Sequence, residues 1–237
     1  MPRVAAGPAA GLRISRGGAS ADYARGTNEL PVQVALFDLL RPGDVFLDVG
    51  ANVGFFSLLA ARAVGPAGQV YAVEPVPANA EQIRRGARRN RLAVDVLELA
   101  LTDRTGTTTL VLAMHPGGAA VASAAAPPDP TGTIEVETDT VDRLVSSGRI
   151  RVPSVVKVDV EGAESEVLAG MTATLATHRP AVICEIDGAD PGELDRKRSE
   201  LTAAFDGAGY RIHPLDPSYE GSEWLVEHVV ARPAGAL

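Results

Sequence analysis

A short apolar run that leads into a glycine loop constrains this fold more than any other feature of the sequence. Residues 45–49 are Val-Phe-Leu-Asp-Val, and the segment that follows contains Gly50 and Gly54. Residues 55–64 then show the spacing of apolar positions that is typical of a helix, up to a Gly-Pro pair. The order strand, glycine loop, helix predicts an α/β domain with this loop at the carboxyl end of a buried strand.

The same alternation of strands and helices continues along the chain. Two strand–helix–strand units in succession predict a parallel sheet with right-handed crossovers. The last two strands, separated by a turn-rich linker, are expected to close this sheet as a terminal pair. The expected strands are residues 45–49, 69–73, 94–101, 154–160, 181–186, 210–215 and 224–231. The expected helices are residues 30–40, 55–64, 78–90, 163–177 and 193–208.

Residues 106–137 interrupt this alternation. Their two flanks, residues 107–113 and 133–137, alternate polar and apolar side chains like an antiparallel strand pair. The middle, residues 114–132, is rich in Ala, Gly and Pro and predicts a long irregular loop. Such loops in compact domains are often lids or binding loops, so we expect an insertion made of a hairpin and a loop.

The size and composition of the chain favour one globular domain. It has 237 residues, of which 46% are hydrophobic and 22% are charged, enough to bury a sizeable core. Residues 1–28 are rich in Gly, Ala and Arg without periodicity, which predicts a flexible or loosely packed N-terminal arm. The folded domain is therefore expected to comprise residues 29–237.

The charge balance argues against nucleic acid and membrane partners. The chain has 22 Lys and Arg against 30 Asp and Glu, a net charge of -8, which does not suit a surface that neutralises phosphates. No stretch approaches the roughly 20 apolar residues that span a bilayer. Pro and Gly interrupt the first residues before a secretory apolar core could form. We therefore expect a cytoplasmic protein.

The sequence Asp48-Val49-Gly50-Ala51-Asn52-Val53-Gly54 occupies the place where α/β proteins bind nucleotide-like cofactors. Its glycines let the backbone approach a ligand, and the helix that follows points its N-terminus at it. The glycine spacing departs from the G-x-G-x-x-G pattern of dinucleotide-binding proteins. A pyrophosphate is therefore disfavoured, and Asp48 suits a ligand that carries an ammonium or sulfonium cation.

Glu74 supports a nucleoside ligand. It lies 20 residues after Gly54 (74 minus 54), at the end of the next expected strand and before Pro75. A carboxylate at this place can accept hydrogen bonds from both hydroxyls of a ribose. A solvated charge at a strand end is the alternative, but the preceding glycine loop favours nucleoside binding.

Further ionisable residues gather at the ends of two later strands. Lys157, Asp159 and Glu161 alternate with valines, so they share one side of an extended segment. Such groups near the end of a central strand are costly unless they are paired or functional, and a structural ion pair of Lys157 is one explanation. Because ligands bind outside the carboxyl ends of the strands, the acidic residues of all these strands should converge on one crevice. These residues are Asp48, Glu74, Asp159, Glu161 and Glu185.

Four motifs resemble, in their order and context, the FkbM family of S-adenosylmethionine-dependent methyltransferases. They are residues 48–54, Val73-Glu74-Pro75, residues 100–103 (Ala-Leu-Thr-Asp) and residues 157–164 (Lys-Val-Asp-Val-Glu-Gly-Ala-Glu). The resemblance covers roughly residues 23–187, including a short element from Tyr23 to Glu29. It implies an α/β, Rossmann-like class I methyltransferase fold, with a mostly parallel seven-stranded sheet, helices on both faces and the insertion described above.

The resemblance also implies a cofactor, S-adenosylmethionine, with S-adenosylhomocysteine as the product. The segment 48–54 would hold the methionine part, Glu74 would bind the ribose, and residues 100–103 would lie beside the adenine. After Glu185 the sequence departs from the family, since Ile186-Asp187 replaces the His found in many members. The cofactor-binding residues expected from the resemblance are Glu29, Asp48, Gly50, Ala51, Asn52, Gly54, Glu74, Pro75, Ala100, Leu101, Asp103 and Asp159.

The chemistry of such a cofactor requires alignment of an acceptor and, for a hydroxyl, removal of a proton. We therefore expect O-methylation of a small-molecule natural product such as a polyketide or a sugar. The expected catalytic residues are Asp159, Glu161 and Glu185, and His115 and His178 are further candidates for a base. No metal site is predicted, although three carboxylates could hold Mg²⁺ and bind a diol.

Two other functions are compatible with parts of the sequence. A nicotinamide-dependent oxidoreductase is disfavoured by Asp48 and by the glycine spacing. A non-catalytic nucleoside-binding module would keep the glycine loop and Glu74, but it would not need Lys157, Asp159 and Glu161 together. The sequence does not indicate an oligomeric state.

Overall fold

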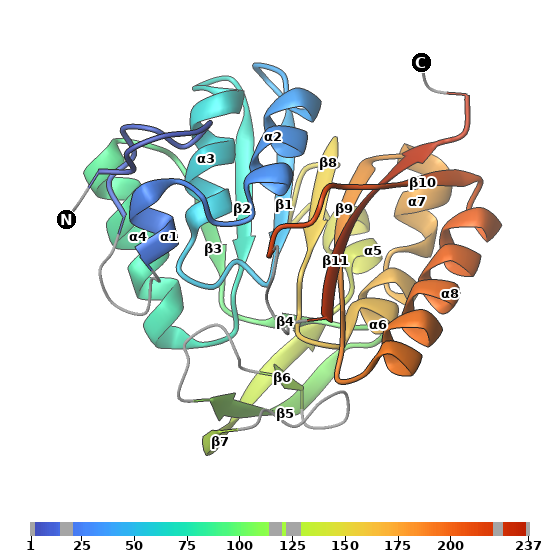
Figure 1. The fold of residues 1–237 in the computed structure, drawn as a ribbon. Helices are drawn as coiled ribbons and strands as arrows, with labels where there is room; N and C mark the ends of the chain where they lie inside the picture. The colour runs from blue at the N-terminus through green and yellow to red at the C-terminus, as the bar shows by residue number, and fades with distance from the viewer. Residues whose placement is uncertain (1–2, 15–20, 114–119, 122–128, 220–224, 236–237) are drawn as a thin grey trace.

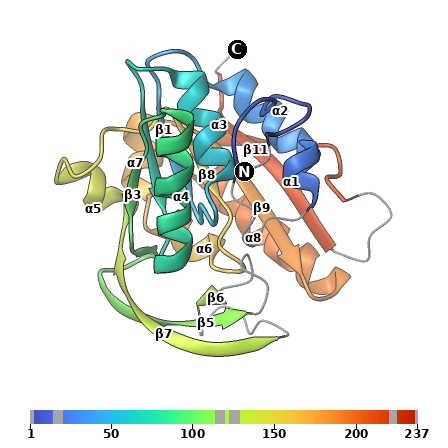
Figure 2. The ribbon, with the colours of Figure 1, turned by 90° about the vertical axis from the view of Figure 1, so that its left-hand side faces the viewer.

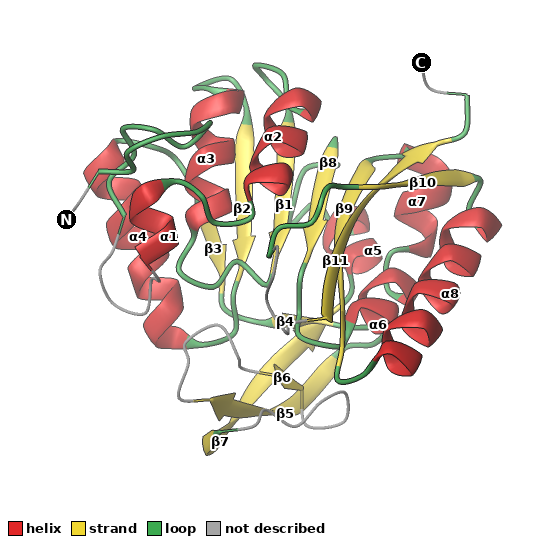
Figure 3. Cartoon of the chain, viewed as in Figure 1, coloured by secondary structure: helices red, strands yellow, loops and turns green. Residues whose placement is uncertain are grey.

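The computed structural model describes residues 3–14, 21–113, 120–121, 129–219 and 225–235. These residues form a domain built on a central sheet with helices on both faces (Figure 1; Figure 3). The strands of this sheet are β1 (Val45–Val49), β2 (Gln69–Val73), β3 (Asp95–Leu97), β8 (Val155–Val158), β9 (Ala181–Gly188), β10 (Tyr210–Pro214) and β11 (Leu225–Pro233). They lie in the order β10-β11-β9-β8-β1-β2-β3, and β11 runs antiparallel to both neighbours while the other pairs are parallel. The predicted seven-stranded, mostly parallel sheet is confirmed.

Helices pack on both faces of this sheet, as the two views show (Figure 1; Figure 2). One face carries α1 (Ala21–Arg25), α2 (Leu30–Leu39), α3 (Phe55–Val64) and α4 (Pro77–Asn90), and the other carries α5 (Val141–Ser146), α6 (Glu164–Ala169), α7 (Thr172–His178) and α8 (Pro191–Gly207). Phe46 and Val155 pack under α2 and α3, whereas their neighbours Leu47 and Val156 pack under α5–α8. Burial on both faces explains why these strands are apolar throughout. None of the described helices combines the length and the hydrophobicity needed to cross a membrane.

A smaller second sheet lies across the end of the domain toward which β2 points in Figure 1, and Figure 2 shows the same sheet from the side. It consists of β4 (Ala100–Leu101), β5 (Gly106–Ala113), β6 (Ala120–Val121) and β7 (Pro130–Asp139), in the order β4-β7-β5-β6. The antiparallel pairing of β5 with β7 confirms the predicted hairpin. The predicted irregular loop, residues 114–132, lies largely outside the described residues.

Two expected elements are divided in the structure. The expected strand 94–101 leaves the central sheet after β3, because Ala100 and Leu101 pair with Thr138 and Asp139 of the second sheet instead. The expected helix 163–177 is broken into α6 and α7 at Gly170, where a Cβ atom would lie 2.0 Å from the carbonyl oxygen of Thr102. Both interruptions are caused by tertiary contacts with the second sheet and the segment that leads to it.

The described part of the N-terminal segment is packed, which corrects the expected flexible arm. Val4, Leu12 and Ile14 are buried in the core under α3. The backbone N–H of Arg13 donates to Asn90 Oδ1 at the end of α4, and Asn90 Nδ2 donates back to the Arg13 carbonyl, both at 2.8 Å. The irregular spacing of these apolar residues hides the packing from a search for periodicity.

Candidate active site

A row of charged side chains crosses four neighbouring strands, near the carboxyl ends of β1, β8 and β9 and in the first half of the antiparallel β11. Asp48 on β1 is in register with Lys157 on β8, and Glu185 on β9 is in register with His228 on β11. Each of the four lies two residues from a member of the core under α2 and α3, so all four point to that face of the sheet. These core members are Phe46, Val155, Ile183 and Val230.

Lys157 neutralises part of the row. The residue is 2% exposed, and its ammonium lies 2.6 Å from Asp159 Oδ2 and 4.7 Å from the centre of the Phe56 ring. Burial alone would lower the pKa of Lys157, but the carboxylates of Asp159, Glu29 and Asp48 raise it above its usual value. Lys157 is therefore a buried cation. Its ion pair with Asp159 agrees with the structural ion pair that was one explanation of this motif in the sequence.

His228 joins two of the carboxylates. Its Nε2 lies 2.8 Å from Glu185 Oε2 and 3.5 Å from Glu29 Oε2, while Nδ1 lies 3.2 Å from the Ser218 hydroxyl. Burial alone would lower the pKa of His228, but the hydrogen bond with Glu185 and the nearby carboxylate of Glu29 raise it. Burial, followed by the charge of Asp159, raises the pKa of Glu185. The pair therefore holds a proton at neutral pH.

Two buried carboxylate oxygens of the cluster lack a hydrogen-bond donor within the described part of the chain. Glu29, at the start of α2, accepts hydrogen bonds at Oε1 from Asn28 Nδ2 and the Tyr219 hydroxyl. Its Oε2 has only the 3.5 Å contact with His228. Asp48 accepts a hydrogen bond from Ser57 at Oδ2, whereas its Oδ1 has no donor. Since buried acceptors are almost always satisfied, this arrangement suits a ligand that brings N–H donors.

Glu74 links the glycine loop to the start of α4 through hydrogen bonds. Its Oε2 accepts a hydrogen bond from the backbone N–H of Asn52 at 2.8 Å, and its Oε1 accepts one from Val76 N–H at 2.9 Å and one from Asn79 Nδ2 at 3.4 Å. Burial, opposed by these hydrogen bonds, raises the pKa of Glu74 to about 7. A carboxylate oxygen accepts about two hydrogen bonds, so Oε2 keeps a free acceptor site.

The two glycines of the loop serve the packing of the chain itself. Both have positive φ, 79° at Gly50 and 83° at Gly54. A Cβ atom at Gly50 would lie 1.7 Å from the carbonyl oxygen of Asp159, and one at Gly54 would lie 2.9 Å from the side chain of Ile83. The close approach that the sequence analysis attributed to a ligand is therefore, at these positions, an approach to β8 and α4.

Glu161 differs from its neighbours because it makes no hydrogen bond or ion pair with the described residues. It is half-buried and has a positive φ of 54°, a strained conformation that often marks functional sites. Burial, followed by the charges of Asp159 and Glu185, raises its pKa to about 9. By contrast, Glu164 accepts hydrogen bonds from Val160 N–H and Gly162 N–H, which is a structural role.

Other expected site residues lie apart from the charged row. Ala100 and Leu101 are buried in β4, and Asp103 is exposed with its carboxylate 3.5 Å from Arg104 Nε. His178 ends α7 on the opposite face, and His115 lies outside the described residues. No contact with the row is described for Asp103, so its expected place beside the adenine stays a prediction.

Two functional candidates were missed by the sequence analysis. His228 becomes a partner of Glu185 only through the register of β11 against β9, and Tyr219 reaches Glu29 from 190 positions along the chain. Neither lies in a motif. The one signal that pointed to His228 was a pair of polar residues, Glu227 and His228, inside a run that is otherwise apolar from Leu225 to Ala231.

The arrangement also offers ligands for a metal ion. Glu29, Glu185 and His228 each present one ligand atom, and these atoms lie within 4.8 Å of one another. His228 must lose the proton at Nε2 before it can bind a metal, and its two carboxylate neighbours oppose this loss. The charges therefore favour a protonated histidine over a bound ion.

Together these features define a class of protein. The chain builds outward from β1 to β3 and then returns to add β8 and β9 on the other side, which makes a crevice at the carboxyl ends of β1 and β8. The glycine loop after β1, the acidic residue after β2 and the antiparallel β11 complete the fold of the class I S-adenosylmethionine-dependent methyltransferases.

Comparison with known proteins identifies the family. The methyltransferase FkbM domain matches residues 48–212, so the chain belongs to the FkbM methyltransferase family. It is 29% identical over 221 residues to the 31-O-demethyl-FK506 methyltransferase FkbM of Streptomyces tacrolimicus, which covers 81% of this chain and 82% of that protein. It is 31% identical over 165 residues to the hexuronic acid methyltransferase AglP of Haloferax volcanii, covering 70% of this chain and 65% of that protein.

A solved structure supports the fold alone. The methyltransferase FkbM from Methylobacillus flagellatus superposes with a TM-score of 0.52 at 15% identity, over 84% of this chain and 50% of that one. The chain thus leaves half of that protein and about a third of AglP unmatched.

Proposed function

We propose that this methyltransferase transfers the methyl group of S-adenosylmethionine to a hydroxyl of a small-molecule natural product, such as a polyketide or a sugar. The observation that carries this proposal is the buried carboxylate pair Glu29 and Asp48, each with an oxygen that has no hydrogen-bond donor among the described residues. The amino-acid part of S-adenosylmethionine has an ammonium group, whose N–H donors and positive charge match these two oxygens.

Glu74 would hold the ribose. Within the part of the chain that the structure describes, its Oε2 accepts a hydrogen bond only from the Asn52 N–H, so this oxygen can accept one from a ribose hydroxyl as well. The assignments of Ala51, Pro75, Ala100, Leu101 and Asp103 to the cofactor rest on family resemblance and belong to the same proposal.

When bound, S-adenosylmethionine supplies a methyl group activated by its sulfonium centre. We assign proton removal to Glu161, because it alone of the three catalytic candidates makes no hydrogen bond or ion pair with the described residues. Asp159, fixed by Lys157, and Glu185, fixed by His228, would position the acceptor. With its pKa raised to about 9, Glu161 holds a proton at neutral pH, and a cation beside it would lower this pKa and leave the carboxylate ionised, so that it can accept the proton of the hydroxyl.

The acceptor class rests on the relatives. By their names, one acts on 31-O-demethyl-FK506 and the other on a hexuronic acid, which supports a small acceptor molecule. A cytoplasmic location and the absence of nucleic acid or membrane partners are also part of this proposal. They are supported by the composition of the sequence alone.

The test is an incubation with methyl-labelled S-adenosylmethionine and a panel of hydroxylated polyketides and sugars. We expect label on an acceptor oxygen, and Glu161→Gln should lower turnover about a hundredfold while the affinity for cofactor stays unchanged. Transfer to nitrogen would overturn the O-methylation, and full turnover of Glu161→Gln would overturn its role. Cofactor binding without transfer to any acceptor would favour a non-catalytic nucleoside-binding module instead.

A further inference from the structure

Helix α2 presents an apolar face to the outside of the molecule. Leu30, Val34 and Phe37 are 40%, 45% and 52% exposed, and their spacing of four and three residues puts them on one side of the helix. The opposite side buries Val32 and Leu36 against the core. Contiguous exposed apolar side chains of this kind mark a surface that binds a partner.

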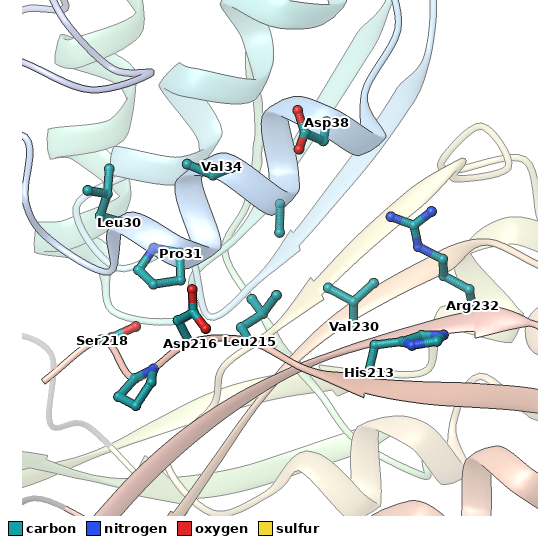
Figure 4. Close-up of a pocket in the computed structure, with 12 residues that line it drawn as sticks. Leu30, Pro31, Val34, Asp38, His213, Leu215, Asp216, Ser218, Val230 and Arg232 are labelled. Atoms are coloured by element: carbon teal, nitrogen blue, oxygen red, sulfur yellow. The ribbon is translucent and has the colours of Figure 1, made fainter. Parts of the chain in front are cut away.

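A groove runs beside this face (Figure 4). It has a volume of about 920 Å³ and lies between α2 on one bank and β10, β11 and the segment after β10 on the other. Val34 lines it from α2, and Leu215 and Val230 line it from the opposite bank. A ridge of apolar side chains therefore lies next to an apolar hollow on one surface.

Unpaired charges of opposite sign flank the groove. Asp38 stands on the α2 bank, and Arg232 stands on the β11 bank at the same end of the groove (Figure 4). Asp216 and His213 also line the second bank. None of these four side chains makes an ion pair or a hydrogen bond with the described residues. Each bank thus carries a charged side chain that could form an ion pair with another molecule.

We propose that this surface, α2 with the adjoining groove, is the contact between two copies of this chain. A two-fold axis that runs along the groove places α2 of each copy opposite the β10–β11 bank of the other copy. Rotation about this axis moves a residue across the groove but keeps its position along it. Val34 and Phe37 then enter the opposite hollow, and Asp38 meets Arg232 of the partner subunit. A surface that carries both ridge and hollow, and acid and base on opposite banks, is complementary to itself.

The first test is sedimentation of the purified full chain at micromolar concentration. We expect a dimer, twice the 24.6 kDa of the chain. Phe37→Glu should weaken dimerisation about thirtyfold or more, as expected for an aromatic side chain central to an interface. Val152→Glu is the matched control, since Val152 is an apolar residue with 41% exposure outside the groove, and it should leave the dimer intact.

A charge exchange tests which residues meet. Asp38→Arg alone and Arg232→Asp alone should each dissociate the dimer, because each places like charges in contact. A mixture of the two variants should form a mixed dimer, since both of its contacts then join Arg to Asp. Circular dichroism should show every variant folded.

Three results would overturn the proposal. They are a monomeric wild-type chain, a dimer that Phe37→Glu leaves intact, and a failure of the two charge variants to associate when mixed. A monomeric chain whose Val34→Glu variant loses affinity for a methyl acceptor would assign the groove, which Val34 lines, to a small molecule instead.

Discussion

At the scale of single residues, Lys157 decides whether the buried carboxylates are tolerated. It is the cation bonded to Asp159, and its charge acts on Glu29, Asp48 and Glu185 as well. Removing one partner of a buried ion pair leaves an uncompensated charge, which costs far more than the intact pair contributes.

We predict that Lys157→Met lowers the free energy of unfolding by about 3–5 kcal/mol. Lys197→Met is the matched control, since Lys197 is the other lysine of the chain and pairs with the partly exposed Asp187 at 3.0 Å. We expect it to cost about 1 kcal/mol. Urea denaturation of both variants checks this, and equal losses would contradict a special role for Lys157.

Glu74 makes stability depend on pH. Its pKa rises from 4.5 in the unfolded chain to about 7 in the folded one because it is buried. The folded state therefore keeps a proton that the unfolded state releases between these values, so Glu74 destabilises the fold increasingly as pH rises from 4.5 to 7.

We predict that Glu74→Gln removes this dependence. Relative to the wild type, the ligand-free variant should gain about 3 kcal/mol between the two pKa values, less any hydrogen bonds it loses. Denaturation at a series of pH values measures the difference, with exposed Glu135→Gln as the control. A difference that does not change with pH would show that Glu74 is ionised in the folded protein throughout.

At the scale of elements, Gly50 allows the end of β1 to pack closely against the residue that follows β8. A Cβ atom there meets the Asp159 carbonyl oxygen at 1.7 Å, and φ is 79°. Gly50→Ala should therefore destabilise the protein by about 4 kcal/mol or prevent folding. Gly43→Ala isolates the cost of a positive φ, about 1 kcal/mol, because Gly43 has φ of 94° and open space around it. Thermal unfolding compares the two variants, and equal effects would contradict the close approach.

Local patterns predicted some elements to the residue. The bounds of β1, α3 and β2 match the expected ones, because a glycine loop and sharp turns delimit them within the sequence. The separation of β3 from β4 was not predictable, since it depends on pairing with Thr138 and Asp139 about 40 residues later.

The same limit applied to the candidate site. Asp48 lies near the end of β1, and Glu74 and Asp159 directly follow β2 and β8, so their convergence could be expected from the parallel topology. His228 could not be assigned, because a register shift of one residue between β9 and β11 would turn its side chain to the opposite face.

At the scale of the whole molecule, the charge balance of the site predicts activity without a metal ion. The proton on His228 Nε2, between the carboxylates of Glu185 and Glu29, takes the place that an ion bound to these three residues would need. We expect EDTA treatment to leave methyl transfer and cofactor affinity unchanged. Loss of either on chelation, with recovery on adding Mg²⁺ or Zn²⁺, would contradict this.

Calorimetric titration of the ligand-free protein tests the central claim, that buried carboxylates bind the cationic end of S-adenosylmethionine. The ligands are S-adenosylmethionine, S-adenosylhomocysteine and methylthioadenosine, which lacks the ammonium group, with NAD as the negative control. We predict that Glu29→Gln weakens the first two about tenfold to a hundredfold and leaves methylthioadenosine unchanged, since charged hydrogen bonds contribute about 1.5–3 kcal/mol. Glu74→Ala should weaken all three. Wild-type protein that is folded but binds none of them, or Glu29→Gln with wild-type affinity for S-adenosylmethionine, would contradict this role of the buried carboxylates.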